Sequence, residues 1–261
     1  YQRFGRLSAE LMANLSGISA QTESDAQRFT ALGLAPAACT VSGNIKFDLH
    51  LLPTHRQAAE RQRRLWDSQR QVWLAASTHP GEEAQLLEAF ALVRQRYPQL
   101  LLVLVPRHPD RAATIAAQVT DSGWQLARHS GQSDRPLSAS VDVVLGDTIG
   151  ELLVFYGAAD IAFVGGSLIE RGGHNPIEPA VWGCPVVAGA SQYNFSEASQ
   201  LLVAAGAMQL VAGSQELAER VAGWLADSAA RAAAGSAGER IAEQNGGALE
   251  RQLAVIAAQL D

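Results

Sequence analysis

The chain has 261 residues, 48% of them hydrophobic and 18% charged, which is ordinary for a globular protein with one large or two small cores. Its net charge of −6 argues against a nucleic-acid partner, because general nucleic-acid binders usually carry a basic excess. Cys39 and Cys184 are the only cysteines and form no C-x-x-C pair, so we expect buried thiols in a reducing compartment. No segment approaches the ~20 apolar residues of a membrane span.

Strand-like and helix-like segments alternate along the chain. The predicted strands are 18–21, 40–43, 72–76, 101–105, 124–128, 141–145, 161–164, 185–187 and 208–211. The predicted helices are 6–14, 54–66, 81–97, 109–122, 148–157, a helix from 176, 196–205 and the alanine-rich remainder. The chain begins at Tyr1 within this pattern, so we expect a fragment that lacks its N-terminal part. Apolar strands that alternate with helices predict an α/β fold, with a Rossmann-like parallel sheet and helices on both faces.

The run GGHNPIEP at residues 172–179 is the most informative stretch. Gly172 and Gly173 let a backbone come close to a ligand, because neither carries a Cβ. Asn175, Pro176 and Glu178 suit an N-cap, a first helical position and a capping box. The free N–H groups of such a helix start attract anions such as phosphate. A plain cap explains the last three residues but not the Gly-Gly-His before them.

Two earlier turns, after strands 72–76 and 101–105, are less decisive. The first reads STHPGEE and suits a plain capped helix, with His79 as its only pointer to chemistry. The second reads PRHPDR, in which Arg107 could fork onto a phosphate or pair with Asp110 on the surface. The sequence favours neither role for this arginine.

The turn after strand 141–145 reads GDTIGEL. Thr148 and Glu151 fit a capping box, whereas Gly150 in a first helical turn would cost about 1 kcal/mol relative to alanine. This glycine suggests that something approaches the helix face. Because the carboxyl ends of parallel strands meet at one edge, the four turns together predict a ligand that bears a phosphate.

The common cofactor motifs are missing from the chain. No G-x-x-x-x-G-K-[ST] is present, which excludes a P-loop NTPase, and Gly165-Gly166 does not form a G-x-G-x-x-G. No cluster of His, Cys and acidic residues has metal-ligand spacing. We therefore expect neither a metal nor another cofactor.

Five motifs occur in a single order along the chain. They are GNIKFD at 43–48, STHPGEE at 77–83, PRHP at 106–109, GDTIGEL at 146–152 and GGHNPIEP at 172–179. Together they resemble the C-terminal half of a 3-deoxy-D-manno-octulosonic acid (Kdo) transferase, and YNF at 193–195 resembles a further element of that family. The family usually has a Gly-Pro-His-like stretch where this chain reads GASQY at 189–193, which leaves the role of that loop open.

The resemblance implies the GT-B fold, in which two Rossmann-like domains face a cleft. It implies inverting transfer of Kdo from CMP-Kdo to a lipid A precursor, in lipopolysaccharide biosynthesis at the cytoplasmic face of the bacterial inner membrane, without a bound metal. Residues 1–40 would be a remnant of the N-terminal acceptor domain and linker, and residues 41–261 the C-terminal CMP-Kdo-binding domain. The general base would lie in the missing domain, so no catalytic residue is named and the fragment, itself soluble, should transfer no Kdo.

By the same resemblance, a set of strand-end residues lines the CMP pocket: Pro106, Arg107, Ile149, Gly150, Glu151, Asn175, Pro176, Ile177 and Glu178. Possible additional members are Lys46, Thr78, His79, Gly172, Gly173, His174 and Asn194. Arg107 would stabilise the charge that grows on the phosphate as the glycosidic bond breaks. Glu151 and Glu178 would accept hydrogen bonds from ribose hydroxyls or the cytosine amine.

Two other interpretations stay open. The first is another GT-B enzyme, such as a UDP-sugar transferase or an epimerase, which titration with CMP against UDP would separate. The second is a non-catalytic nucleotide-binding module, which the length of the natural gene product would separate.

Overall fold

The computed structural model describes residues 5–132 and 134–258. The chain forms two compact units, the first made of Tyr1–Leu49 with Ala242–Asp261 and the second of His50–Ile241. The second unit holds the strands and turns on which the predicted phosphate ligand depends. The predicted boundary between residues 40 and 41 concerns the family's domains and stays a prediction.

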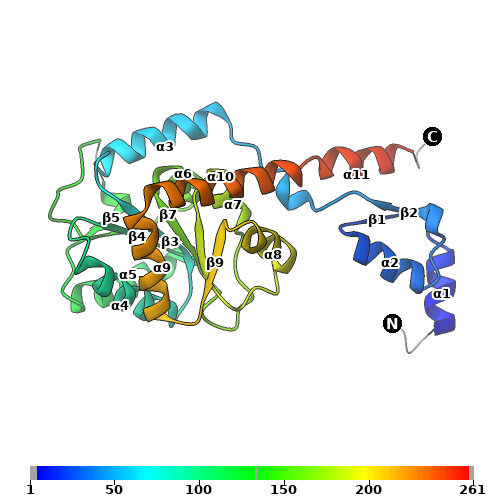
Figure 1. Ribbon diagram of the computed structural model, residues 1–261, viewed down its shortest axis with the longest axis horizontal. Helices are drawn as coiled ribbons and strands as arrows, with labels where there is room; N and C mark the ends of the chain where they lie inside the picture. Colours follow the sequence, from blue (N-terminus) through cyan, green and yellow to red (C-terminus); the bar gives the residue numbers. More distant parts are fainter. Residues whose placement is uncertain (1–4, 133, 259–261) are drawn as a thin grey trace. The chain divides into compact units, whose positions relative to one another are not determined.

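A seven-stranded sheet forms the centre of the second unit (Figure 1). Its strands are β3 (Val72–Thr78), β4 (Leu101–Pro106), β5 (Leu126–Arg128), β6 (Val143–Leu145), β7 (Ile161–Val164), β8 (Val186–Gly189) and β9 (Met208–Val211). Their order is β5-β6-β4-β3-β7-β8-β9, and all neighbouring pairs are parallel. After β3, the chain adds β4, β5 and β6 on one side of this strand and then β7, β8 and β9 on the other. The topological switch point, where such sheets bind ligands, therefore lies between β3 and β7.

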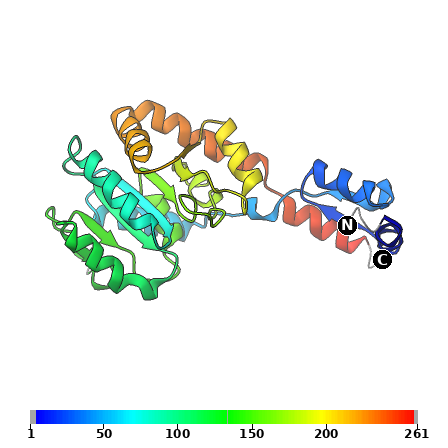
Figure 2. The same ribbon diagram turned by 90° about the horizontal axis from the view of Figure 1, so that it is seen from below.

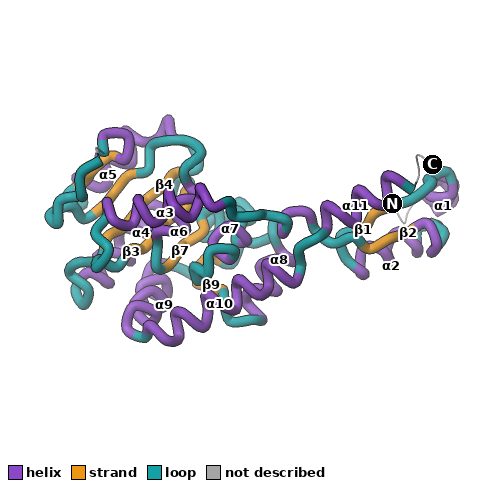
Figure 3. Tube along the Cα trace, turned by 90° about the horizontal axis from the view of Figure 1, so that it is seen from above, coloured by secondary structure: helices purple, strands orange, loops and turns teal. Residues whose placement is uncertain are grey.

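Helices cover both faces of this sheet, as the turned views also show (Figures 2 and 3). They are α3 (Pro53–Leu65), α4 (Glu82–Arg94), α5 (Ala112–Asp121), α6 (Leu152–Ala158), α7 (Ile177–Ala180), α8 (Ser196–Ala204), α9 (Ser214–Ala226) and α10 (Ser228–Gln244), with the 3₁₀ turns η4 (Pro109–Arg111) and η5 (His129–Gly131). The predicted α/β class with a Rossmann-like parallel sheet is confirmed.

Alternate residues of β3 enter two different cores. Trp73 and Ala75 join the cluster formed with α4, α5 and α9, while Leu74 joins the cluster that contains Trp66 and residues of α6. The three strand side chains have no exposed surface, which explains why β3 is apolar from Val72 to Ala76. The continuous apolar runs in the sequence thus reflect a sheet covered on both faces.

The first unit is a small βαβ arrangement. It contains α1 (Gly5–Ala13), β1 (Ile18–Ala20), α2 (Glu23–Ala31), the 3₁₀ turn η2 (Pro36–Ala38), β2 (Cys39–Val41), the 3₁₀ turn η3 (Ile45–Phe47) and α11 (Ala248–Ala257). β1 and β2 pair in parallel. The Asp48 carboxylate accepts the backbone N–H groups of Gly247 and Leu249, which fixes the start of α11. No helix of the described residues is both long and apolar enough to cross a membrane.

Helix α2 was absent from the sequence prediction. It begins after Thr22, whose side chain accepts the N–H of Asp25 at 3.0 Å, as an N-cap does. Its residues are mostly polar, and Ala26 is its one buried position. Because α2 has no apolar stripe, the hydrophobic pattern does not indicate this helix, and the cap residue Thr22 is its only signal in the sequence.

Candidate functional site

Glu82 joins the two loops that flank the switch point. Its residue has no exposed surface, and its carboxylate accepts four backbone N–H groups. Oε2 accepts from His79 at 3.0 Å and Gly166 at 2.7 Å, and Oε1 accepts from Ser167 and Leu168, both at 3.0 Å. Successive N–H groups after a strand make a nest that suits an anion. Here the protein's own carboxylate occupies that nest, so a ligand phosphate must bind elsewhere along the edge.

The ends of β3, β4 and β7 approach one another unusually closely. Ser77 has φ 55°, in the left-handed region that few non-glycine residues adopt, and the register between β3 and β4 shifts between Ala76 and Thr78. A Cβ on Gly165 would lie 2.5 Å from the Ser77 carbonyl oxygen, so only glycine fits there. The Arg107 N–H donates to the Thr78 carbonyl at 3.0 Å. This bond holds the end of β4 beside that of β3.

Three imidazoles, His79, His108 and His174, gather at the ends of β3, β4 and β7, and we call them the imidazole cluster. The Nε2 atoms of His79 and His174 are 2.7 Å apart and their ring planes differ by 4°, so the two rings share one hydrogen bond edge to edge. The His108 ring meets His79 edge-on, at 5.9 Å between centroids. Burial, then the charges of His79, Arg107 and His108, lower the pKa of His174 to about 4. Burial also lowers the pKa of His79, although Glu82 opposes this.

Glu178 and Arg107 lie close enough to interact. Burial raises the pKa of Glu178, whereas the hydrogen bond from Asn175 Nδ2 (3.2 Å to Oε1) and the charge of Arg107 lower that pKa. Arg107 is exposed, and among the described residues no ion pair or side-chain hydrogen bond engages it. The alternative of a surface pair between Arg107 and Asp110 is therefore wrong for this structure. The guanidinium is free to meet a ligand.

Two side chains hold Glu151 after β6. Thr148 Oγ1 donates to Glu151 Oε2, and His129 Nε2 lies 3.2 Å from Oε1. His129 follows β5, its side chain is 10% exposed, and its ring packs edge-on against Phe155 at 4.8 Å. His129 was not among the site residues predicted from the sequence. Its only signal in the sequence was an Arg-His pair at a strand end, as in Arg107-His108 after β4.

The predicted capping box at this turn is wrong. α6 begins at Leu152, with Glu151 at the N-cap position and no side-chain cap bond. Gly150 precedes the helix with φ 88°, and a Cβ on it would meet nothing within 4 Å. The left-handed backbone, and not a neighbour of the helix face, therefore explains this glycine.

Packing inside the protein accounts for Gly172 and Gly173. Their φ angles are 82° and 70°, and their Cβ atoms would lie 2.4 Å from Tyr193 Cε2 and 2.6 Å from Gln192 Oε1, respectively. The backbone N–H of Asn194 donates to the Gly172 carbonyl at 3.0 Å. The loop at 189–193, whose role the sequence left open, thus supports the glycine turn together with Asn194. A close ligand is not needed to explain the two glycines.

The helix after this turn is too short for the predicted dipole effect. α7 has four residues, and its N-cap position falls on Pro176 where the sequence predicted Asn175. The Ile177 N–H already donates to Asn175 Oδ1 at 3.0 Å, and Glu178 bonds the Asn175 side chain where a capping box would use the backbone. One turn aligns few peptide dipoles. We therefore assign the attraction for an anion to Arg107.

All but one of the predicted site residues end or follow strands of the seven-stranded sheet, at its carboxyl edge. Those at this edge are Thr78, His79, Pro106, Arg107, Ile149, Gly150, Glu151, Gly172, Gly173, His174, Asn175, Pro176, Ile177, Glu178 and Asn194. Ile177 and Thr78 have no exposed surface and shape the site by packing, whereas Ile149 is 86% exposed. Lys46, the only lysine of the sequence, lies in η3 of the first unit.

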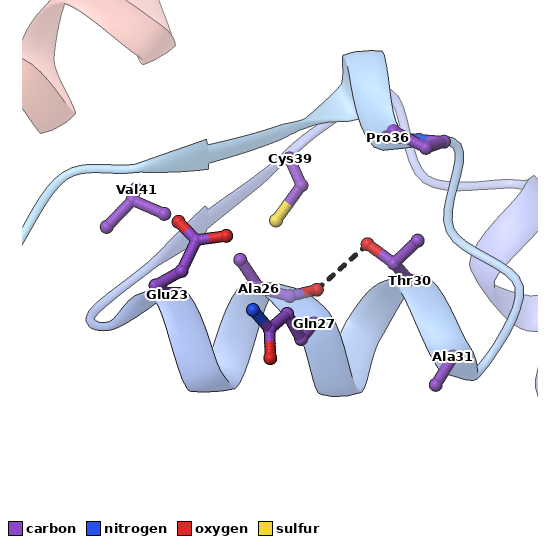
Figure 4. A pocket seen from close by; sticks show the side chains of 8 residues that line it. All are labelled: Glu23, Ala26, Gln27, Thr30, Ala31, Pro36, Cys39 and Val41. Atoms are coloured by element: carbon purple, nitrogen blue, oxygen red, sulfur yellow. Dashed lines mark hydrogen bonds between the residues drawn. The ribbon is translucent and has the colours of Figure 1, made fainter.

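A hollow of about 480 Å³ lies in the first unit, between α2 and β2 (Figure 4). Its lining residues are Glu23, Ala26, Gln27, Thr30, Ala31, Pro36, Cys39 and Val41. The one charged side chain among them is a carboxylate, so the hollow does not suit a phosphate. In the described parts of the chain, no group of three or more His, Cys, Asp or Glu could hold a metal ion.

Comparison with known sequences gives one family. A family model described as "3-Deoxy-D-manno-octulosonic-acid transferase (kdotransferase)" matches residues 1–49. The 3-deoxy-D-manno-octulosonic acid transferase of Haemophilus influenzae is 36% identical over 99% of this chain and 61% of its own length. That of Bordetella pertussis is 36% identical over 95% of this chain and 58% of its own length. The chain thus spans about three fifths of these relatives.

Comparison with solved structures agrees on the family and the fold. The Anabaena protein HepE, solved with UDP and glucose, has a TM-score of 0.56 at 19% identity, over 99% of this chain and 68% of its own. At this identity, the likeness shows the fold alone. HepE and the domain described next confirm the C-terminal domain of a GT-B glycosyltransferase as the fold. The C-terminal CMP-Kdo binding domain of WaaA from Acinetobacter baumannii has a TM-score of 0.66 at 33% identity, over 72% of this chain and 96% of that domain. The chain therefore belongs to the Kdo transferase family.

Proposed function

We propose that this chain is the donor-binding part of an inverting Kdo transferase, which moves Kdo from CMP-Kdo to a lipid A precursor. The observation that carries the proposal is the match to 96% of a solved CMP-Kdo binding domain at 33% identity. The acceptor would be reached at the cytoplasmic face of the bacterial inner membrane, in lipopolysaccharide biosynthesis. The carboxyl edge around the switch point is the site that this function needs.

Three polar side chains at that edge have a role in this proposed function. The Arg107 guanidinium would bind the CMP phosphate, because it is exposed and unpaired among the described residues. Glu178 and Glu151 would accept hydrogen bonds from the ribose hydroxyls and the cytosine amine. Both carboxylates are oriented by neighbours, Glu178 by Asn175 and Glu151 by His129. Oriented acceptors favour one nucleotide over others, since an unmatched donor would stay unpaired.

The chemistry follows from the leaving group. As the glycosidic bond breaks, the CMP phosphate gains negative charge, which Arg107 would stabilise where it develops. A general base must also take the proton of the acceptor hydroxyl from within hydrogen-bond reach. By family resemblance this base belongs to the N-terminal domain, so we expect no Kdo transfer by residues 1–261 alone. Transfer of Kdo to a lipid A precursor by this chain alone would contradict the assignment of the base to the N-terminal domain.

The proposed phosphate role is tested by Arg107→Ala in calorimetric titrations with CMP and with cytidine. A charged hydrogen bond contributes about 1.5–3 kcal/mol, so CMP should bind roughly 10–150-fold more weakly while cytidine changes little. Arg220→Ala, on an exposed position of α9, is the matched control and should leave both affinities unchanged. Equal losses for CMP and cytidine would assign Arg107 to structure.

A further inference from the structure

The proposed nucleotide contacts leave the imidazole cluster without a role. His79, His108 and His174 follow three adjacent strands, in the order β4-β3-β7. His79 lies innermost at 9% exposure, His174 is partly exposed and His108 is exposed, so the cluster reaches the surface of the site. A purely structural cluster would not need an exposed member.

The order of the strands places the cluster relative to the nucleotide. Glu151 follows β6 and Arg107 follows the neighbouring β4, while His79 and His174 follow β3 and β7 beyond it. The imidazoles lie on the far side of Arg107 from Glu151, on the side where Glu178 also follows β7. Arg107 acts electrostatically on His174, so an oxyanion bound by Arg107 would also face the imidazoles.

The bond between His79 and His174 leaves the pair able to accept one more proton. In the neutral pair, one Nε2–H donates to the other Nε2 across 2.7 Å. The accepting ring then carries its proton on Nδ1, and the donating ring has a free Nδ1. A proton added at that free Nδ1 charges the pair without breaking the bond between the rings. The pair can thus change its charge while its geometry stays fixed.

The charges around His79 are mostly compensated. Glu82, Arg171, Arg111 and His108 act on it electrostatically. The Glu82 carboxylate is saturated by four N–H groups, and Arg111 Nη1 is 2.7 Å from the buried Glu83 carboxylate. Arg171 remains exposed and, within the described residues, makes no ion pair.

The charges that act on His174 are positive. Besides its ring partner, Arg107 and His108 act on it. Arg107, like Arg171, has no ion-pair partner among residues 5–132 and 134–258. Two guanidiniums without an ion-pair partner among the described residues therefore act on a partly buried, uncharged imidazole pair, and Arg107 also acts on Glu178. An anion bound here would complete the charge balance and favour a proton on the pair.

We propose that the imidazole cluster is a second anion subsite beside Arg107, which binds an oxyanion of the donor and takes up a proton as it does so. The inference rests on the proposed function, since the donor of a Kdo transferase carries both a phosphate and a sugar carboxylate. Either oxyanion could occupy the subsite, and the two sources separate by titration. Anion binding would then strengthen as the pH falls from about 8 to about 6, because the anion favours the protonated pair.

The test is proton uptake during binding, measured by calorimetry at pH ~6.5 in two buffers with different heats of ionisation. The ligands are CMP-Kdo, CMP and cytidine. Because the phosphate of CMP-Kdo is a diester, that ligand has no group that titrates near this pH. When CMP-Kdo binds, the wild-type chain should take up about half a proton, if the anion returns the pair to the ordinary histidine pKa of about 6.5. When cytidine binds, which has no oxyanion, the chain should take up none.

His174→Gln removes the titrating ring while its amide can still meet His79, and it should abolish the uptake. His50→Gln, at an exposed histidine of the same unit, should keep it. If CMP induces more proton uptake by the wild type than by His174→Gln, the subsite binds the phosphate. If only CMP-Kdo induces such a difference, the subsite binds the sugar carboxylate. Wild-type binding of CMP-Kdo without uptake overturns this inference alone, with no variant needed. Failure of the wild type to bind any of the ligands overturns the proposed function too.

Discussion

Replacing Glu82 by glutamine should remove much of the stability of the second unit. The carboxylate accepts two N–H groups at each oxygen. A glutamine can keep one pair through its carbonyl, but its amide group would then face the other two donors. Two charge-assisted bonds of about 1.5–3 kcal/mol each would be lost, so we expect a loss of about 3–6 kcal/mol in unfolding free energy. This is a large part of the 5–15 kcal/mol typical of a domain.

Urea unfolding followed by tryptophan fluorescence measures this loss. All five tryptophans lie in the second unit, so the signal reports that unit alone: Trp66, Trp73, Trp124, Trp182 and Trp224. Glu88→Gln, an exposed glutamate of the same helix α4, is the matched control and should change stability by less than about 0.5 kcal/mol. A loss below about 1 kcal/mol for Glu82→Gln would refute the four-bond arrangement.

Three further changes test the site and its surroundings. Because burial raises the pKa of Glu178, the stability that this group contributes is present at low pH and is lost as the pH rises through its folded pKa. Glu178→Gln should therefore gain unfolding free energy relative to wild type between about pH 4 and pH 7, yet bind CMP more weakly in calorimetry. Gly172→Ala should cost more stability than the ~1–2 kcal/mol of Gly150→Ala in urea unfolding, because the φ angles are similar and only Gly172 lacks room for a Cβ. Burial raises the pKa of the Cys184 thiol, so a thiol reagent should label partly exposed Cys39 in the native chain and both cysteines in urea.

The sheet was predictable because its strands are continuous apolar runs. Leu101–Pro106 and Ile161–Val164 are buried at every position, as two covered faces require. Two elements show the limits of this pattern. α2 lacks an apolar stripe, and the turn before α6 resembled a capping box although Gly150 adopts a left-handed backbone. Local side-chain chemistry fits several backbone paths, and tertiary contacts select among them.

The strand-end residues of the site were predictable, but their partners were not. Glu82 looked like a first-turn glutamate, yet three of its four N–H donors lie more than 80 residues away, as its bond to Gly166 at a separation of 84 illustrates. His79 and His174 are 95 residues apart. His129, which holds Glu151, gave no signal beyond its place at a strand end. Such contacts depend on the order of the strands, which one sequence does not reveal.

The most direct test of the central claim is a calorimetric titration of residues 1–261 with CMP and, separately, with UDP. We expect saturable binding of CMP, which UDP does not match at the same concentration. Binding should be weak, because by family resemblance half of the donor cleft belongs to the N-terminal domain. No heat and no thermal shift with millimolar CMP, or tighter binding of UDP than of CMP, would contradict the assignment of this chain as a CMP-Kdo-binding domain.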